Sequence, residues 1–133
     1  MKREIKFRAY SSHNHKMYPV SNIEWDTDGR IWVTADDGKN GIELIDEEAH
    51  LTQYTGLKDK NGREIYEGDI VRTGKDNIGD PELMIGQVIM REGSWLIENE
   101  KMQEAIELFS EITSREVIGN IFENPELLEA QHE

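Results

Sequence analysis

The centre of the chain, residues 53–71, reads QYTGLKDKNGREIYEGDIV. Asn61-Gly62 is the strongest short turn signal in the sequence, because both residues tolerate the positive φ angles of a tight hairpin. The extended segment before this turn and residues 64–66 after it have the composition of β-strands. Glu67-Gly68 interrupts the returning strand, and another strand is expected at 69–72. The stretch therefore predicts short antiparallel strands joined by tight turns.

The rest of the sequence continues this pattern of short strands. Apolar and polar residues alternate as they do in half-buried strands, and Asp28-Gly29 provides a second hairpin turn. Pro19 predicts an edge position for its strand, because proline cannot donate a ladder hydrogen bond. Further strands are expected at 3–9, 17–20, 23–25, 31–33, 42–45, 84–91, 94–98 and 117–122.

Two helices are expected near the C-terminal end. Apolar residues between Met102 and Ile112 fall at helical spacing among good helix formers, which predicts a helix near 100–110. Asn124 and Pro125 have the composition of a helix start, with the asparagine as the cap and the proline in the first turn.

These elements predict a mainly β fold. We expect a small SH3-like or partly open β-barrel of short antiparallel strands, with the helix near 100–110 and a short C-terminal helix. One domain over residues 1–133 is expected. Within it, an N-terminal β subregion (1–50) and a barrel-like subregion (51–124) can be distinguished.

The composition is that of an acidic protein with enough apolar residues for a core. The chain has 133 residues, a net charge of −13 and no cysteine, so disulfides and thiolate metal sites are excluded. The sequence shows no signal peptide and no apolar run long enough to cross a membrane. We therefore expect a soluble protein in the cytoplasm of its host cell, with no membrane partner.

The charge is unevenly distributed along the chain. Residues 1–18 are net basic, whereas residues 98–133 are strongly acidic. The acidic balance disfavours broad binding to nucleic acid. The asymmetry also permits head-to-tail pairing of N- and C-terminal regions, within or between chains.

Familiar catalytic and metal-binding motifs are missing from the sequence. There is no P-loop, GxGxxG motif or GxSxG elbow, and the segment that starts at Asp59 lacks the ligands of a calcium loop. His13 and His15 are better explained as solvated turn residues than as zinc ligands. The carboxylates at 36–37 and 46–48 are better explained as solvated loops. We therefore expect no catalytic residue, cofactor or metal, and no enzymatic activity.

The tryptophans are candidates for aromatic recognition. Alternation along the strand places Trp32 on the face opposite Ile31 and Val33, so one exposed indole could anchor a partner or stack on a base. Packing in the core or at a barrel rim is the alternative for all three tryptophans.

Three segments in order resemble the YopX family of small bacteriophage and prophage proteins: IKFRAY (5–10), the central stretch (53–71) and EVIGNIFENPELL (116–128). The resemblance covers residues 5–128. It implies a mainly β protein, intracellular in an infected host and carried by mobile elements. It implies no assigned biochemical role and supplies no catalytic residues.

We therefore expect a non-enzymatic phage or prophage accessory protein that acts through contacts with an unknown host or phage protein, and as a homo-oligomer. The alternatives are a nucleic-acid-associated module and an acidic DNA mimic that inhibits a host enzyme. Tyr54 and Thr55 have no turn role that demands their side chains. A contact site is expected where Tyr54 meets Glu67 and Asp69, with Trp32 as a further partner contact.

Overall fold

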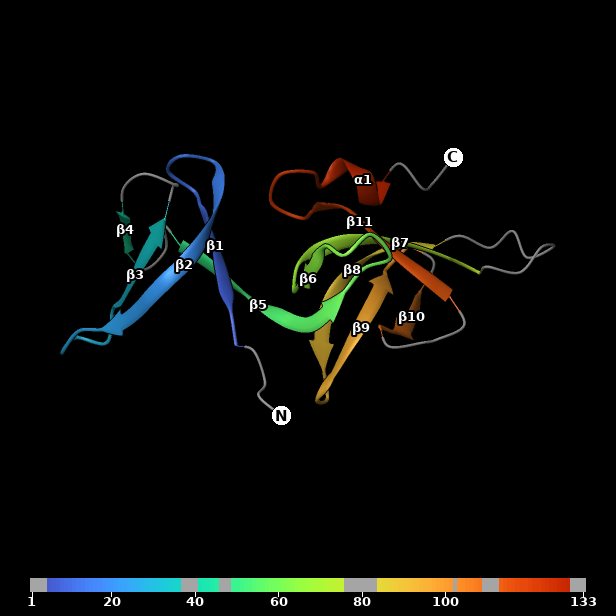
Figure 1. Cartoon of the computed structure of the whole chain (residues 1–133), viewed down its shortest axis with the longest axis horizontal. Coiled ribbons are helices and arrows are strands. Elements are labelled where there is room, and N and C mark those ends of the chain that lie inside the picture. The colour runs from blue at the N-terminus through green and yellow to red at the C-terminus, as the bar shows by residue number, and fades with distance from the viewer. Residues whose placement is uncertain are drawn as a thin grey trace. The chain divides into compact units, whose positions relative to one another are not determined.

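The structure is a computed structural model that describes residues 5–36, 41–45, 49–75, 84–101, 103–108 and 113–129. These residues form eleven strands and one short helix (Figure 1), which confirms the mainly β prediction. The elements are β1 (Phe7–Ser11), β2 (Lys16–Trp25), β3 (Ile31–Asp36), β4 (Gly41–Ile45), β5 (Ala49–Lys58), β6 (Glu64–Tyr66), β7 (Asp69–Lys75), β8 (Met84–Arg91), β9 (Ser94–Asn99), β10 (Glu104–Glu107), β11 (Thr113–Asn120) and α1 (Glu126–Glu129).

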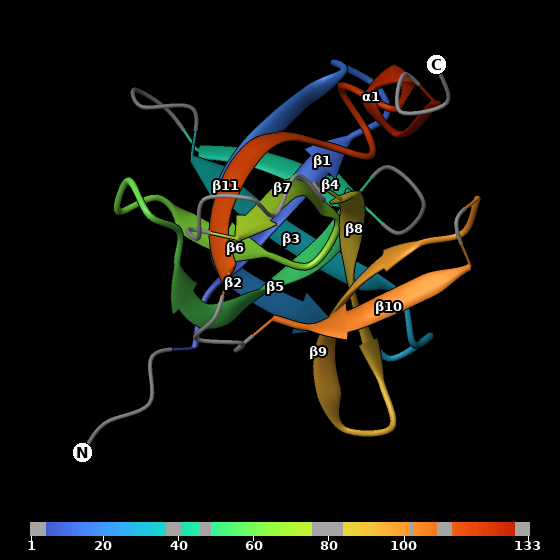
Figure 2. The same ribbon diagram turned by 90° about the vertical axis from the view of Figure 1, so that its right-hand side faces the viewer.

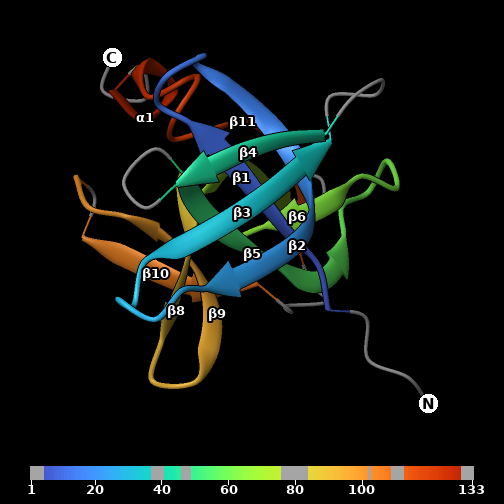
Figure 3. The ribbon, with the colours of Figure 1, turned by 90° about the vertical axis from the view of Figure 1, so that its left-hand side faces the viewer.

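The chain divides into two compact units, Met1–Tyr54 and Thr55–Glu133. Unit 1 contains an antiparallel sheet in which β4, β3, β2, β1 and β5 are neighbours in that order. Figure 3 shows β3 between β4 and β2. The core of this unit is small, because two of its fully buried members are alanines. It consists of Ala9, Tyr18, Val33, Ala35 and Leu44.

The prediction of an edge strand at Pro19 is wrong, because β2 lies between β1 and β3. Pro19 pairs with Arg8 of β1, whereas the pairing with β3 begins one residue later, where Val20 lies opposite Ala35. The register with β3 then shifts between Val20 and Asn22. An interior strand accepts this proline because its pairing with β3 starts only after it.

Unit 2 contains the second antiparallel sheet, in the order β10-β9-β8-β7-β11. Figure 2 shows β8 and β9 joined by a tight hairpin, and its turn residues Glu92 and Gly93 both have positive φ. The short strand β6 pairs with β5 at the edge of the other sheet. The core of unit 2 is larger and is built from Ile65, Val71, Met84, Val88, Ile97, Leu108 and Val117.

Both sheets are open among the described residues, because the outermost strands of each have no pairing with one another. The partly open form of the predicted fold is therefore confirmed, and the described strands do not close into a barrel.

The helix predicted near 100–110 is wrong. Residues 104–107 form β10, which pairs antiparallel with β9 and places Ile106 opposite Ile97. Ile106 packs against the core of unit 2, and Leu108 is buried within it. Strand pairing and burial of these two side chains thus outweigh the local helix propensity of the segment.

The short C-terminal helix is confirmed as α1, but the side chain of Asn124 is used differently from the expected cap. Asn124 Oδ1 accepts the backbone N–H of Asn120 at 3.2 Å. Asn120 Oδ1 in turn accepts the N–H groups of Phe122 at 3.0 Å and Glu123 at 2.8 Å. The two asparagines therefore build the turn between β11 and α1.

Candidate functional site

The turn at residues 59–63 is organised by the carboxylate of Asp59. Its Oδ1 accepts the backbone N–H of Asn61 at 2.8 Å and that of Arg63 at 2.9 Å. The backbone closes the same turn, since Asp59 N donates to Arg63 O at 2.8 Å and Gly62 N to Asp59 O at 3.0 Å. Gly62 has a φ of 85°, a conformation that glycine adopts without strain. The predicted hairpin turn is confirmed.

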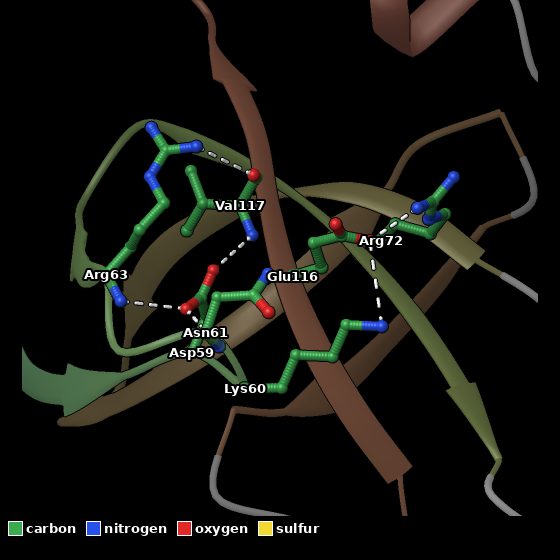
Figure 4. A network of polar contacts seen from close by, with 7 residues as sticks. All are labelled: Asp59, Lys60, Asn61, Arg63, Arg72, Glu116 and Val117. Carbon is green, nitrogen blue, oxygen red and sulfur yellow. Dashed lines mark hydrogen bonds and ion pairs between the residues drawn. The ribbon is translucent and has the colours of Figure 1, made fainter.

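The other oxygen of Asp59 reaches the last strand of the unit. Asp59 Oδ2 accepts the backbone N–H of Val117 in β11 at 2.9 Å (Figure 4). Two further bonds join the same segments: Lys60 N donates to Arg115 O at 2.9 Å, and Arg63 Nη1 donates to Val117 O at 3.2 Å. The turn is therefore fastened to β11 by backbone and side-chain hydrogen bonds.

Asp59 is kept as an anion by these bonds. Burial by itself raises the pKa of Asp59, but the N–H donors of Val117, Arg63 and Asn61 and the positive charge of Arg63 outweigh it and hold the pKa below its ordinary value. A carboxylate with three backbone donors has little capacity left to act as a general base. Its arrangement suits a structural cross-link.

Ion pairs surround this cross-link on the exposed side of β11. Arg72 forms a hydrogen-bonded ion pair with Glu116, and Lys60 Nζ lies 3.9 Å from Glu116 Oε1. The hydrogen bond from Arg72 lowers the pKa of Glu116. Both basic side chains are about half exposed, so each pair adds little to stability.

The same turn occurs a second time, in unit 1. Residues 26–30 are Asp-Thr-Asp-Gly-Arg and residues 59–63 are Asp-Lys-Asn-Gly-Arg. Asp26 Oδ1 accepts the N–H groups of Asp28 and Arg30, both at 2.9 Å. Asp26 N donates to Arg30 O at 3.0 Å, and Gly29 N to Asp26 O at 3.0 Å. The hydrogen bonds of the two turns therefore correspond one by one.

The second carboxylate oxygen of Asp26 accepts hydrogen bonds from side chains of its own hairpin. Asp26 Oδ2 accepts Trp32 Nε1–H at 3.0 Å and Arg30 Nε–H at 3.2 Å. The tryptophan hydrogen bond is the main cause that lowers the pKa of Asp26 to about 2. The half-buried indole of Trp32 is thus fixed to the turn, whereas the ring of Trp25 is exposed.

The residues predicted as partner contacts are placed in both units. Tyr54 ends unit 1, where its ring is buried and Lys6 Nζ lies 5.5 Å from the ring centroid. Thr55 Oγ1 in unit 2 donates to Ile65 O at 2.8 Å. Asp69 is buried and accepts the Tyr66 N–H at 2.8 Å, and Glu67 is half-buried beside it. A joint role of Tyr54, Glu67 and Asp69 stays a prediction, as does a contact role of Trp32.

Comparisons with known proteins bear on the family and the fold of the chain. A family model described as YopX protein matches residues 6–129. The chain belongs to the YopX family. The Asp59 cross-link joins the central stretch (53–71) to the segment that begins at Glu116, and both lie within the residues that the family model matches.

Two crystal structures show the same fold as this YopX-family chain. Protein YopX from Bacillus subtilis superposes with a TM-score of 0.66 at 19% sequence identity, over 92% of this chain and 96% of that one. A protein from Enterococcus faecalis superposes with a TM-score of 0.57 at 24% identity, over 96% of this chain and 99% of that one. No curated protein matches the sequence.

Two features are absent from the described ranges of the chain. These ranges hold no group of three or more His, Asp or Glu side chains placed to bind a metal ion. No helix among them has the length and apolar character that crossing a membrane requires. His13 is exposed in the turn between β1 and β2, and His15 Nδ1 lies 3.4 Å from Tyr10 Oη.

Sequence reasoning missed Arg115, a buried cation of this YopX-family fold. Its Nε donates to Leu108 O at 3.1 Å and its Nη2 to Glu107 O at 2.7 Å. Burial lowers the pKa of Arg115. The recurrence of Asp-x-Asx-Gly-Arg was a signal for the role of Asp59, whereas no local pattern marks Arg115.

Proposed function

We propose that this chain is a non-enzymatic accessory protein of a phage or prophage that acts in the host cytoplasm through protein–protein contacts and self-associates. The observation that carries the proposal is the structural use of the polar groups in the central stretch. Asp59 is occupied by three backbone N–H groups, and Thr55 and Asp69 make hydrogen bonds within their own segment.

Because these polar groups are hydrogen-bonded within the fold, we infer that the exposed surface makes the functional contacts. The described surface carries a large exposed aromatic side chain, Trp25, which is 66% exposed. Exposed tryptophans are enriched where proteins contact partners. Charged side chains are exposed in the turns at 26–30 and 59–63, among them Asp28, Arg30 and Lys60, which suits contacts governed by charge complementarity.

Self-association is tested by sedimentation velocity of the untagged chain from low to high micromolar concentration. We expect a weight-average mass that rises above the monomer mass with concentration. A sample that stays monomeric over the whole range contradicts the homo-oligomer. A contact with another phage or host protein is tested separately, by affinity purification of the full chain from infected cells, with quantitative mass spectrometry against an untagged control.

A nucleic-acid-associated module is the second candidate. Lys58, Lys60, Arg63 and Arg72 have exposed side chains in unit 2 and could contact a phosphate backbone. The net charge of −13 opposes this role. Fluorescence anisotropy with labelled single-stranded DNA separates the candidates, because phosphate contacts give binding that weakens steeply with salt, whereas an absence of binding even at low salt removes the module. An acidic DNA mimic would instead recover a basic host enzyme in the affinity purification.

A further inference from the structure

The two matching turns present opposite charges. We call residues 24–30 the acidic turn and residues 58–63 the basic turn. In the acidic turn Glu24 and Asp28 are exposed, while the positive charge of Arg30 is paired with Asp26. In the basic turn the only acid, Asp59, is buried and fully hydrogen-bonded.

The basic turn therefore shows only cationic and neutral groups to solvent. Lys58, Lys60 and Arg63 are all exposed. Lys60 Nζ approaches Glu116 only to 3.9 Å, and its side chain remains 50% exposed. Arg63 uses Nη1 for Val117 O, which leaves further N–H donors of the guanidinium for another acceptor.

The acidic turn also carries an apolar anchor. Trp25 is the last residue of β2 and pairs with Ile31 across the hairpin. Its indole extends beyond the small core of unit 1 and is 66% exposed, in contrast to Trp32, which is fixed by Asp26. Trp25 is flanked in the sequence by Glu24 and Asp26. Its exposed ring suits a lysine or arginine side chain, with which it can make a cation–π contact.

We propose that the acidic turn of one copy of this chain docks on the basic turn of a second copy. The proposal rests on the self-association proposed above and assigns its surfaces. Two chains of charge −13 repel each other over most of their surface. Contact is therefore favoured where a cationic surface of one copy meets an anionic one of the other, and the basic turn supplies such a surface.

The contact between the two turns is small and governed by charge, so the association is expected to be weak and sensitive to salt. Two turns bury far less than the roughly 1,200 Å² at which stable protein interfaces begin. Exposed ion pairs are screened within about 8–10 Å at physiological salt. The association is therefore weak, in the range that sedimentation velocity detects at high protein concentration, and it falls as salt is added.

A charge exchange between the turns tests the proposal. Variant A carries Glu24→Lys and Asp28→Lys, and variant B carries Lys58→Glu and Lys60→Glu. These substitutions leave Asp26, Asp59 and Arg63 in place, so the hydrogen bonds that build the turns are kept. The matched control, Glu43→Lys with Glu104→Lys, changes the net charge as variant A does, at exposed positions outside both turns.

The proposal predicts a specific pattern in sedimentation velocity at low salt. Each variant alone is expected to associate at least about tenfold more weakly than the native chain, because like charges then face each other. An equimolar mixture of A and B is expected to regain association, since each reversed turn meets its complement. Trp25→Ser is expected to weaken association without changing the circular dichroism spectrum. The control, which lowers the repulsion between copies as variant A does, is expected to associate at least as strongly as the native chain.

Two results would overturn the assignment, and they differ in what they mean for self-association. Native-like association of A and of B alone refutes the docking of the turns but leaves the homo-oligomer intact. A native chain that is monomeric at every concentration and salt refutes both. Circular dichroism of each variant confirms that a loss of association is not a loss of fold.

Discussion

Asp59 and Val117 are hydrogen-bonded at 2.9 Å although they lie 58 positions apart in the chain. The bond joins a tight turn after β5 to the middle of β11, where Val117 also contributes to the core of unit 2. A buried carboxylate that satisfies three backbone donors holds a turn and a strand in one geometry. The density of turn and charged residues in the central stretch of this YopX-family chain is therefore explained by its role in organising the fold.

Replacing Asp59 with asparagine tests this role. Asparagine lacks the negative charge. Its NH₂ group replaces one of the two carboxylate oxygens and cannot accept the N–H of Val117 or the N–H groups of the turn. Because the site is buried, we expect Asp59→Asn to lower the free energy of unfolding by about 2–3 kcal/mol. Urea denaturation followed by circular dichroism measures the change. Asp26→Asn is the matched control and should have a smaller effect, since its turn is exposed.

Asn61→Asp is expected to be nearly neutral. The corresponding position of the first turn is Asp28, which makes the same backbone hydrogen bond to the aspartate that starts the turn. We therefore expect a change of less than ~0.5 kcal/mol in the free energy of unfolding, as for other surface substitutions. A loss comparable to that of Asp59→Asn in the same assay would mean that the two turns are not equivalent.

Trp32 should report the ionisation of Asp26. The pKa of Asp26 is lowered to about 2, below the value of about 3.9 for an unfolded aspartate. A folded pKa below the unfolded one adds stability above about pH 4, and this stability is lost as the pH falls toward 2. The Trp32 indole N–H resonance is expected to shift with a midpoint at about pH 2. The transition should vanish in Asp26→Asn; a midpoint near 4 would contradict the hydrogen bond.

Gly119→Ala is expected to destabilise the turn between β11 and α1. A Cβ at this position would lie 2.7 Å from Asn124 Oδ1, so the asparagine that binds Asn120 N must move. We expect a loss of about 1–3 kcal/mol, as for other overpacked sites. In a double-mutant cycle, Asn124→Ala removes Oδ1 but keeps a Cβ that would lie 2.9 Å from the new methyl group. Gly119→Ala with Asn124→Ala should therefore lose somewhat less than the sum of the single changes, and a loss larger than the sum would argue against the clash with Oδ1.

Arg115→Lys tests whether the hydrogen bonds of Arg115 hold the end of β10 in place. A lysine keeps the charge, but its single ammonium cannot reproduce the two donors that reach Leu108 O and Glu107 O. We expect faster amide hydrogen exchange in residues 104–108, with β7 and β8 unchanged, and a stability loss on the order of 1–2 kcal/mol. Uniformly faster exchange across unit 2 would show a general rather than a local role.

The turns were predicted correctly from local sequence signals. Asp28-Gly29 and Asn61-Gly62 form turns because the conformations they need depend on their own backbone. The helix near 100–110 was mispredicted because Ile106 and Leu108 gain more from pairing and burial beside β9 than from local helix propensity. The position of Pro19 depends on where β3 begins to pair, which no local pattern shows.

The candidate site was the least predictable part of the molecule. The sequence indicated no turn role that demands the side chain of Thr55; the structure shows that its hydroxyl donates to Ile65 O. Alternation along β3 placed Trp32 correctly on the face opposite Val33 but could not show its bond to Asp26, nor that Trp25 has the exposed ring. A hydrogen bond between distant segments, such as that of Asp59, depends on the finished fold.

The link between Asp59 and Val117 also bears on synthesis at the ribosome. The pairings of β1 to β4 with one another and of β1 with residues 49–53 of β5 lie within the first 54 residues, so these partners are all present early in translation. The second core needs Val117, which is made 58 residues after Asp59. Because domains generally fold as units, we expect the core of unit 2 to form only after β11 has been made. A ribosome that stalls before this strand thus exposes the apolar side chains of an incomplete core.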